Sequence, residues 1–534
     1  MLYKLKQERY VFLLFAVVIF LLYAKSLFFK FTYLDDNQLL INRTHFLDNF
    51  ANIIKSFQEP VFYLAASGST YYRPILNVFF ILEYNLFSDN FFLYHLFNII
   101  LHLLNTFLVY KFFTKFKVKN TTSIASALIF GVHPVLTQAV GWIPGINDLL
   151  LALFLLPSII YFIDYLENGS NKNLFFYILF FSLSIFTKES AILLIFVYAL
   201  IFFFVKNKRS IKKFLIIFLP QLLTIGAFLY LRFRAVQLDV PGSYAMNSIL
   251  TSFVGGFLVN IGKILFPVNL FVIPILYESN YLYGIASIVI ILLVILISKY
   301  KNARLIIIGA TLFVVSFLPT LINPTPGDKL VMFEHRLYIP LIGVLLVLIG
   351  TSVYTKYFIG KKLYILVIIV FSVLTFVHLD DFQNQYTFWR KAAAIVDIFP
   401  VAKANLAYVY YRDGKVDDAK RLLTELAETE HRDYAYDNLG MIATYEGDFD
   451  KAMDYFKKSL KFNPLNSTTY LFMAYVYKYK NDIPNAKNYF LYAVYTDNDN
   501  IEAMMNLASI YLDEGNTQRA QLIYDEVKKH GVEY

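Results

Sequence analysis

The sequence predicts an all-α protein in two parts: a polytopic helical membrane domain over residues 1–380, and a solenoid of paired helices over residues 381–534. Composition predicts the first part, because 58% of the 534 residues are hydrophobic, only 16% are charged, and the mean hydropathy is +0.54. The apolar residues also fall in long runs, as membrane spans require. A repeat with a period of about 34 residues, which begins near residue 400, predicts the second part.

Cysteine count and charge exclude several functional classes. The chain has no cysteine, which excludes disulfides, thiolate metal sites and cysteine nucleophiles. The formal net charge is +9, but Lys and Arg cluster between apolar runs. That placement is typical of loops kept on the cytoplasmic side of a membrane. We therefore expect a lipid bilayer, and no nucleic acid, as the surrounding partner.

About eleven apolar segments are candidate membrane spans, since a helix needs about 20 apolar residues to cross the hydrocarbon core. The predicted spans are 11–29, 91–113, 121–140, 148–165, 174–187, 191–205, 214–231, 283–298, 305–321, 338–354 and 363–379.

Four basic connectors predict the orientation of these spans. They contain Lys111, Lys115, Lys117 and Lys119; Lys206, Lys208, Arg209, Lys212 and Lys213; Lys299, Lys301 and Arg304; and Lys356, Lys361 and Lys362. With these connectors and the N-terminus in the cytoplasm, an eleven-span count places every connector on the expected side. A first external loop then covers about residues 30–90, and everything after residue 380 is extracytoplasmic. We expect the inner membrane of a bacterium, with an uncleaved first helix.

Two further apolar stretches fit this count poorly. Residues 72–88 contain Arg73 and Glu83, and residues 251–276 contain glycines, Lys263 and prolines. We interpret both as amphipathic or broken helices that roof a cavity on the external side, because irregular backbone at membrane depth requires a protein or water lining. The alternative is that both span, which leaves the parity unchanged.

The adjacent carboxylates Asp35 and Asp36 follow the first span. Acidic groups at the edge of a membrane segment cost desolvation and mutual repulsion, so they are functional candidates. A carboxylate there could take the proton from an acceptor hydroxyl. The alternative is a solvated loop that happens to begin with acidic residues.

Other polar side chains interrupt apolar sequence near the same predicted face. These are His95, His133, Asp148, Lys188, Glu189, Glu334, His335, Arg336 and Tyr338. A single histidine in a helix is more often a packing residue than a ligand, and Lys188 with Glu189 could be a self-paired turn. Their collection at one predicted membrane face favours a shared site.

The C-terminal part repeats small residues at fixed spacing. One series is Ala407, Gly440, Ala474 and Ala508, and a second is Ala419, Ala452, Ala486 and Ala520. Gly414, Gly447 and Gly515 mark turns between paired helices. This is the tetratricopeptide pattern, with about four repeats over residues 400–531. Such arrays present a concave surface to peptides, and capture of a substrate polypeptide and recruitment of partner proteins are equally compatible with it.

The chain resembles the transmembrane O-mannosyltransferases that carry tetratricopeptide repeats and, more distantly, the protein O-mannosyltransferases of the GT-C superfamily. The resemblance is carried by the order of several motifs. They are Asp35–Asp36, Tyr72–Pro74, His95–Asn105, Gly131–Leu150, Thr187–Glu189, Glu334–Pro340 and the repeats. Two positions depart from the pattern: Gln138 stands where an acidic residue is expected, and Ile146–Asn147 where a basic residue tends to lie nearby.

The resemblance implies an inverting transferase that moves a sugar, typically mannose, from a polyprenyl-phosphate donor to a hydroxyl, here expected on Ser or Thr of extracytoplasmic proteins. It implies Asp35 as the general base, with Asp36 hydrogen-bonding the acceptor or holding its backbone. Arg73 is the first candidate to bind the donor phosphate because a guanidinium gives bidentate contacts, and Lys188 and Arg336 are the next. The expected substrate pocket contains His95, His133, Asp148, Glu189, Glu334, His335 and Tyr338.

No cofactor is firmly implied. The donor's phosphate is the leaving group, so no nucleotide-binding loop is needed, and the sequence has neither a Walker-type nor a Rossmann glycine pattern. A divalent metal bridging Asp35 and Asp36 stays open, since some members of the superfamily use one. Two other functions also stay open. An O-antigen or oligosaccharide ligase is less favoured because such enzymes would concentrate their functional residues in a late loop. A non-enzymatic scaffold would recruit partners through the repeats.

Overall fold

The computed structural model describes residues 2–62, 71–204, 210–236, 246–274, 280–321, 331–394, 400–429, 432–498 and 500–529. Within these ranges all regular structure is helical, and the single β-bridge joins Lys301 to Thr351. The all-α class is therefore confirmed. The chain divides into a first unit that ends at Asn384 and a second that continues from Gln385.

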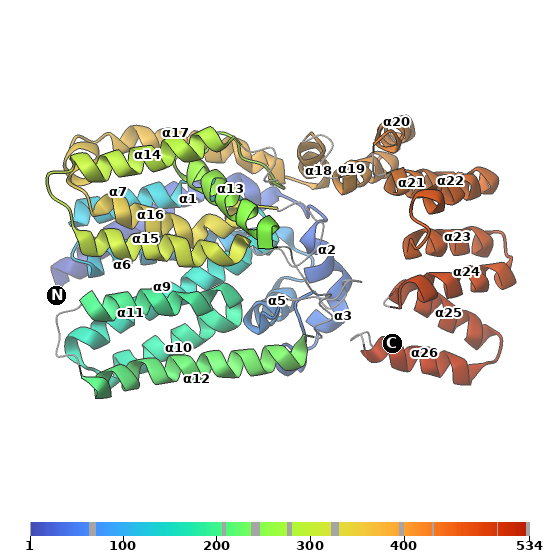
Figure 1. The fold of residues 1–534 in the computed structure, drawn as a ribbon, viewed down its shortest axis with the longest axis horizontal. Helices are drawn as coiled ribbons and strands as arrows, with labels where there is room; N and C mark the ends of the chain where they lie inside the picture. Colours follow the sequence, from blue (N-terminus) through green and yellow to red (C-terminus); the bar gives the residue numbers. More distant parts are fainter. Residues whose placement is uncertain are drawn as a thin grey trace. The chain divides into compact units, whose positions relative to one another are not determined.

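The long helices of the first unit run alongside one another in Figure 1, and α2, α3 and α5 lie together at one end. Their bounds are α1 Leu2–Tyr23, α2 Asp35–Leu39, α3 Thr44–Leu47, α4 Asn52–Lys55, α5 Pro74–Phe87, α6 Phe91–Lys115, α7 Asn120–Gly131, α8 Thr137–Gly141, α9 Ile146–Asn168, α10 Asn171–Thr187, α11 Ile195–Phe204, α12 Ile211–Ala235, α13 Met246–Leu265, α14 Tyr281–Ile297, α15 Ala303–Phe317, α16 Tyr338–Ile349 and α17 Tyr364–Leu379. Short 3-10 turns join several of them, including η4 (Ile143–Gly145), η5 (Glu189–Leu194) and η8 (Glu334–Leu337).

Six described helical segments are long and apolar enough to cross a membrane, and a bent pair would make seven. The six are Lys6–Phe28, Phe91–Lys115, Ile143–Asn168, Ile211–Ala235, Ala303–Leu321 and Tyr364–Phe382; the pair is Asn120–Gly131 with Pro134–Gly141, bent by 51°. The predicted count of eleven is not confirmed. Several expected spans form helices that are too short, such as α16 with 12 residues, which rises only about 18 Å against a core of about 30 Å.

Burial separates a central helix from peripheral ones. The apolar window of the segment containing α9 is 78% buried within the protein, whereas those containing α12 and α17 are each 22% buried. On α12 the leucines Leu219, Leu222, Leu223 and Leu229 are exposed. Exposed apolar faces of this length are expected to contact lipid tails. Several apolar helices with lipid-facing surfaces identify a multi-pass membrane protein.

The two irregular stretches predicted for the external side differ from each other. Residues 74–87 form one helix, α5, with Pro74 in its first turn. In the second stretch, α13 (Met246–Leu265) continues through the glycines and Lys263 and ends shortly before Pro267, so the stretch is interrupted at a proline and not at its glycines. Gly262 instead serves close packing, because a Cβ there would lie 2.9 Å from the backbone nitrogen of Gly284 on α14. Small residues at such positions let two membrane helices approach closely.

Parts of the predicted topology lie outside the described residues. These parts are Lys206, Lys208 and Arg209 of the second basic connector, and the ends of the stretches 191–205 and 251–276.

The second unit contains four helix pairs in succession (Figure 1). They are α19 Pro400–Arg412 with α20 Val416–Ala427, α21 Arg432–Tyr445 with α22 Phe449–Phe462, α23 Ser467–Tyr479 with α24 Ile483–Thr496, and α25 Ile501–Asp513 with α26 Thr517–Lys529; α18 (Gln385–Ala393) precedes them. Gly414, Gly447 and Gly515 adopt φ of +75° to +79° between paired helices, and Asn481 takes this role at +61°. Asparagine tolerates this left-handed conformation better than most residues. The small residues of both predicted series that are alanines are fully buried, so the predicted repeat register is confirmed.

Candidate active site

Asp36 is a buried carboxylate that holds the loop before α2. Its Oδ2 accepts hydrogen bonds from Thr32 N at 2.9 Å, Thr32 Oγ1 at 2.5 Å and Tyr33 N at 3.0 Å. Trp142 Nε1 donates to Thr32 Oγ1 at 3.0 Å, which ties this loop to η4. Burial raises the pKa of Asp36, and the bonds from Thr32, Tyr33 and Trp142 oppose that shift. Asp36 therefore fixes the backbone of its own loop, and its expected contact with the acceptor stays a prediction.

Asp35 lies beside Asp36 but is only partly buried, and among the described residues nothing hydrogen-bonds to its carboxylate. Burial and the neighbouring Asp36 raise the pKa of Asp35 to about 7, against the opposing charges of Arg336 and Arg73. A general base works best when its pKa lies near the operating pH. Asp35 therefore has both the unoccupied lone pairs and the basicity that proton removal from a hydroxyl needs.

Arg73, just before α5, is already paired. Its Nε and Nη2 donate to the two oxygens of Glu189 at 3.0 and 2.6 Å. With the amide of Asn147 oriented so that its oxygen faces the guanidinium, Nη1 donates to it at 3.1 Å. Burial would lower the pKa of Arg73, but Glu189 and its hydrogen bonds raise it overall. This bidentate ion pair with Glu189 neutralises the positive charge of Arg73, which would otherwise be available to bind the donor phosphate.

Lys188 and His335 converge on Asp148 in the first turn of α9. Lys188 Nζ donates to both Asp148 oxygens at 2.8 Å, and His335 Nε2 lies 3.8 Å from Asp148 Oδ2. Gln138 Oε1 accepts from His335 N and Nδ1, both at 3.1 Å, which assigns the proton to Nδ1 and leaves Nε2 unprotonated. Burial lowers the pKa of His335, and the charge of Lys188 lowers it further.

Arg336 lies in η8 and makes weaker contacts than the other two cations near Asp35, Arg73 and Lys188. Its Nη1 lies 3.5 Å from the carbonyl oxygen of Thr320 and 3.4 Å from that of Val331, and no carboxylate among the described residues pairs with it. Its charge nevertheless acts on Asp35, Lys188 and His335. Arg336 is therefore better placed than Arg73 to accept an anionic ligand near Asp35.

Three predicted pocket residues have polar atoms occupied by other protein groups. Glu334 accepts from Lys263 Nζ at 2.8 Å and from Phe271 N at 3.0 Å, and lies 3.2 Å from His378 Nε2. His133 caps a 3-10 turn by accepting from Val135 N and donates to the carbonyl of Ile264 at 2.9 Å.

The hydroxyl of Tyr338 lies 2.8 Å from His102 Nδ1 and accepts from Asn105 Nδ2 at 3.2 Å. The polar atoms of Glu334, His133 and Tyr338 are thus engaged by other protein groups, and their place in a substrate pocket stays a prediction. By contrast, both ring nitrogens of the buried His95 lack a partner among the described residues. Thr32, which orders Asp36, carries no sequence signal that could have identified it.

The acid pair alone does not form a complete metal site. Within the described ranges, no group of three His, Asp or Glu side chains is arranged to hold a metal ion. Asp36 Oδ2 already receives three N–H or O–H donors, whereas Asp36 Oδ1 is buried and has no hydrogen-bond partner among the described residues. Asp36 Oδ1 and the carboxylate of Asp35 each have an oxygen free for a cation, so a divalent metal bridging the pair stays an open alternative.

Comparison with known proteins finds matches in both units. The sequence family described as dolichyl-phosphate-mannose-protein mannosyltransferase matches residues 73–232, and tetratricopeptide-repeat families match residues 433–466 and 501–529. These matches confirm the resemblance expected from the motifs. The first range contains Arg73, Asp148 and Glu189, whereas the Asp35–Asp36 pair lies before it.

Three relatives illustrate the extent of similarity. Protein O-mannosyl-transferase F38B6.6 of Caenorhabditis elegans is 24% identical over 383 residues, covering 66% of this chain and 52% of that protein. Human Protein O-mannosyl-transferase TMTC1 is 36% identical over 99 residues, covering 18% and 11%. The Sol locus transcriptional repressor of Clostridium acetobutylicum is 34% identical over 79 residues, covering 15% and 25%. The chain thus spans about half or less of each relative. The family match over residues 73–232 and the two relatives named as transferases make this chain similar to protein mannosyltransferases.

Proposed function

We propose that this chain, with its mannosyltransferase domain and tetratricopeptide repeats, is a membrane enzyme that transfers a hexose from a polyprenyl-phosphate carrier to Ser or Thr hydroxyls of extracytoplasmic proteins. Mannose is the proposed sugar, since the matching family and relatives are named for it. The observation that carries the proposal is Asp35, a carboxylate with a pKa of about 7 that lies within the electrostatic reach of Arg336.

The reaction is an inverting displacement. The acceptor oxygen forms a bond to the anomeric carbon while the bond from that carbon to the phosphate oxygen breaks. The hydroxyl proton moves to Asp35, and the electron pair of the broken bond leaves with the polyprenyl phosphate. Asp36 keeps the loop of residues 32–36 in place through Thr32 and Tyr33, which orients Asp35.

Arg336 is the proposed contact for the leaving phosphate. A cation aimed at developing negative charge lowers the barrier most when its charge is not already neutralised. Within the described chain, Arg336 has long contacts to carbonyl oxygens and a cation–π contact with the ring of Phe333, but no carboxylate partner. Arg73 and Lys188, by contrast, each hold a carboxylate. We therefore assign Arg73 and Glu189, and Lys188 and Asp148, to positioning the wall of the site.

The repeats are proposed to bring the acceptor polypeptide. The first helices of successive repeats present the exposed tyrosines Tyr408, Tyr445 and Tyr479, and Tyr411 stacks on Tyr445 with ring centroids 5.9 Å apart. Exposed aromatic side chains supply contact area at low entropic cost. A row of them along a solenoid suits an extended peptide.

Glycoproteomics tests the function. Extracytoplasmic proteins are compared from cells that carry the gene, lack it, or carry Asp35→Asn, with Asp48→Asn as the matched control on the same loop. We expect a hexose on Ser or Thr that disappears in the deletion and in Asp35→Asn but persists in Asp48→Asn. A scaffold would tolerate Asp35→Asn. A ligase would change a glycan or lipid and leave Ser and Thr unmodified.

A further inference from the structure

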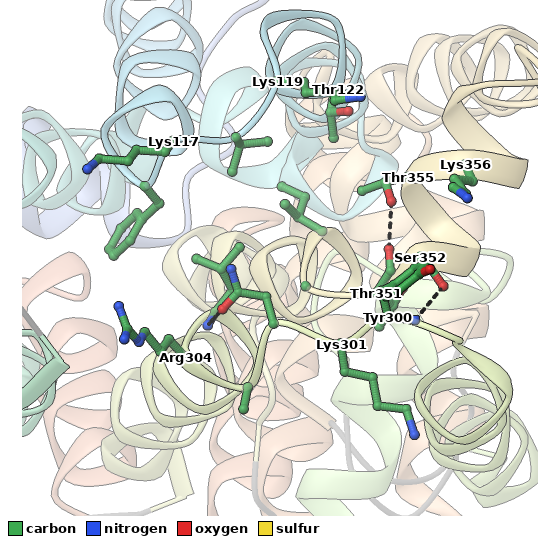
Figure 2. Close-up of a pocket in the computed structure, with 17 residues that line it drawn as sticks. Lys117, Lys119, Thr122, Tyr300, Lys301, Arg304, Thr351, Ser352, Thr355 and Lys356 are labelled. Atoms are coloured by element: carbon green, nitrogen blue, oxygen red, sulfur yellow. Dashed lines mark hydrogen bonds between the residues drawn. The ribbon is translucent and has the colours of Figure 1, made fainter.

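A basic pocket lies between the α6–α7 connection, the start of α15 and the end of α16. Its volume is about 660 Å³, and it is lined by Lys117, Lys119, Lys301, Arg304 and Lys356 together with hydroxyl side chains. Figure 2 shows these cations around the pocket, with Lys117 and Arg304 on one side and Lys301 and Lys356 on the other. Among the residues that the structure describes, no acidic side chain lines it.

The five cations lack acidic partners among the described residues. Two lysines a few residues earlier in the chain behave differently: Lys111 pairs with Glu8 at 2.8 Å, and Lys115 pairs with Asp164. The general preference for basic residues in cytoplasmic loops explains the presence of lysines here. It does not explain why five of them surround one cavity without a carboxylate, since like charges held close together repel.

The walls of the pocket are held rigidly. Asn302 N donates to Gly350 O at 2.7 Å, and Ser352 N donates to Tyr300 O at 3.0 Å. Ser352 Oγ accepts from Tyr300 N at 3.2 Å, and Thr355 Oγ1 donates to Thr351 O at 2.9 Å (Figure 2). These bonds fix the two loops that carry Lys301 and Lys356. A ligand can therefore bind to these cations without first ordering a flexible segment.

A second cavity of about 440 Å³ adjoins the first and shares Lys117 and Arg304 with it. Its other lining includes the apolar side chains Ile163, Ile201, Phe204 and Ile308, and one acidic residue, Glu167. Lys115 and Asn302 also line this second cavity, so it combines polar side chains near the first cavity with a wall of apolar ones. A basic cavity that adjoins one with an apolar wall matches an amphiphile with an anionic head and a hydrocarbon chain better than it matches a free ion.

This pocket lies far from the acid pair. Asp148, in the cluster around Asp35, and Glu167, at the second cavity, belong to the same helix α9 and are 19 residues apart. At 1.5 Å per residue the separation is about 28 Å, close to the thickness of a hydrocarbon core of about 30 Å. The two polar sites are therefore at opposite ends of the helix bundle.

We propose that the pocket lined by Lys117, Lys119, Lys301, Arg304 and Lys356 binds the phosphate headgroup of a membrane lipid, with its chain in the adjoining cavity. A phosphate group is the ligand that suits five cations without carboxylate partners in the described chain and the hydroxyl side chains beside them. The site is distinct from the one proposed for sugar transfer, and its lipid occupies the opposite leaflet.

Native mass spectrometry of the full chain in detergent tests the proposal, with phosphatidylglycerol, phosphatidylcholine of the same chains, and inorganic phosphate as probes. The variant Lys117→Gln/Arg304→Gln removes the two cations shared by both cavities. Loss of two cations, each worth about fivefold near a membrane surface, predicts roughly 30-fold weaker binding of phosphatidylglycerol. The control Lys361→Gln/Lys362→Gln removes the same charge from the same end of the helix bundle, at residues that do not line the pocket. A second control, Lys117→Arg/Arg304→Lys, keeps both positive charges in the pocket.

Selective retention of phosphatidylglycerol that only the pocket variant weakens supports the proposal. Equal weakening by the control variant overturns it, because the effect would then belong to the whole basic face. Displacement by inorganic phosphate at the same concentration also overturns it, because the ligand would then be the free ion. Should the first variant lower the unfolding temperature, Lys301→Gln/Lys356→Gln makes the same comparison from the other side of the pocket. None of these readouts depends on sugar transfer.

Discussion

Replacing Asp35 by Asn removes the proposed base while keeping the shape of the side chain. General-base assistance contributes about 10²–10⁴-fold to rate, so we predict that the transfer rate falls by roughly that factor. In the unsubstituted chain the pKa of Asp35 is about 7. The reactive carboxylate is then about one tenth of the total at pH 6, about half at pH 7 and about nine tenths at pH 8. The rate should rise roughly tenfold between pH 6 and pH 8, and the Asn variant should lose this rise.

The assay follows release of polyprenyl phosphate, or hexose incorporation into a peptide, by the full chain in liposomes. Stability provides an internal control with a defined sign. Because folding raises the pKa of Asp35, its contribution to stability is present at low pH and is lost as pH rises through about 7. Asp35→Asn should therefore be at least as stable as the parent at pH 8. A variant that is folded and transfers at the parental rate, with the same pH profile, would refute Asp35 as the base.

Four further predictions concern other parts of the chain. Arg336→Gln should raise the KM for the lipid-linked donor about tenfold or more and move the pH profile upward, because the charge of Arg336 lowers the pKa of Asp35; an unchanged donor KM would contradict its assignment. Arg73→Gln should instead lower the yield of folded protein, because it leaves the largely buried carboxylate of Glu189 without its partner. The expected loss in the free energy of unfolding is up to about 3 kcal/mol, and a melting curve equal to that of the parent would contradict this. Gly440→Ala should destabilise the repeats by about 1–3 kcal/mol in thermal unfolding, because a Cβ would lie 2.4 Å from an aromatic ring. Tyr445→Ala should reduce glycosylation of long polypeptides while short peptides are modified normally, and equal effects on both would exclude acceptor binding by the repeats.

The repeat unit was predictable from sequence in detail, because its packing is periodic. Ala419, Ala452, Ala486 and Ala520 recur at one position, and all are fully buried. The third turn shows the limit of the pattern. The sequence has no glycine there, and Asn481 supplies the left-handed conformation instead.

The membrane unit was less predictable, because apolar runs do not specify helix length. Residues 338–354 read as one span, yet α16 ends at Ile349 and a π-helical segment follows from Val353. The glycines of α13 suggested a break, whereas they lie at a close helix contact. Hydropathy measures transfer to lipid and contains no information about which partner a helix packs against.

The candidate site was predictable in its residue types but not in its pairings. The sequence places the three cations Arg73, Lys188 and Arg336 near one predicted membrane face. It cannot show that Arg73 is paired with Glu189 and Lys188 with Asp148. That distinction depends on side chains brought together from distant helices. It moves the proposed phosphate contact from Arg73 to Arg336.

Both proposed sites depend on the side of the membrane that each end of the bundle faces. The natural sequence has no cysteine, so single cysteines at the exposed positions Asp48, Asp454 and Lys361 can be labelled in intact cells with a membrane-impermeant maleimide. We predict that Asp48→Cys and Asp454→Cys react from outside, while Lys361→Cys reacts only after the membrane is permeabilised. Labelling of positions 48 and 454 from opposite sides would separate the acid pair from the repeats and contradict the proposed transfer to a captured polypeptide.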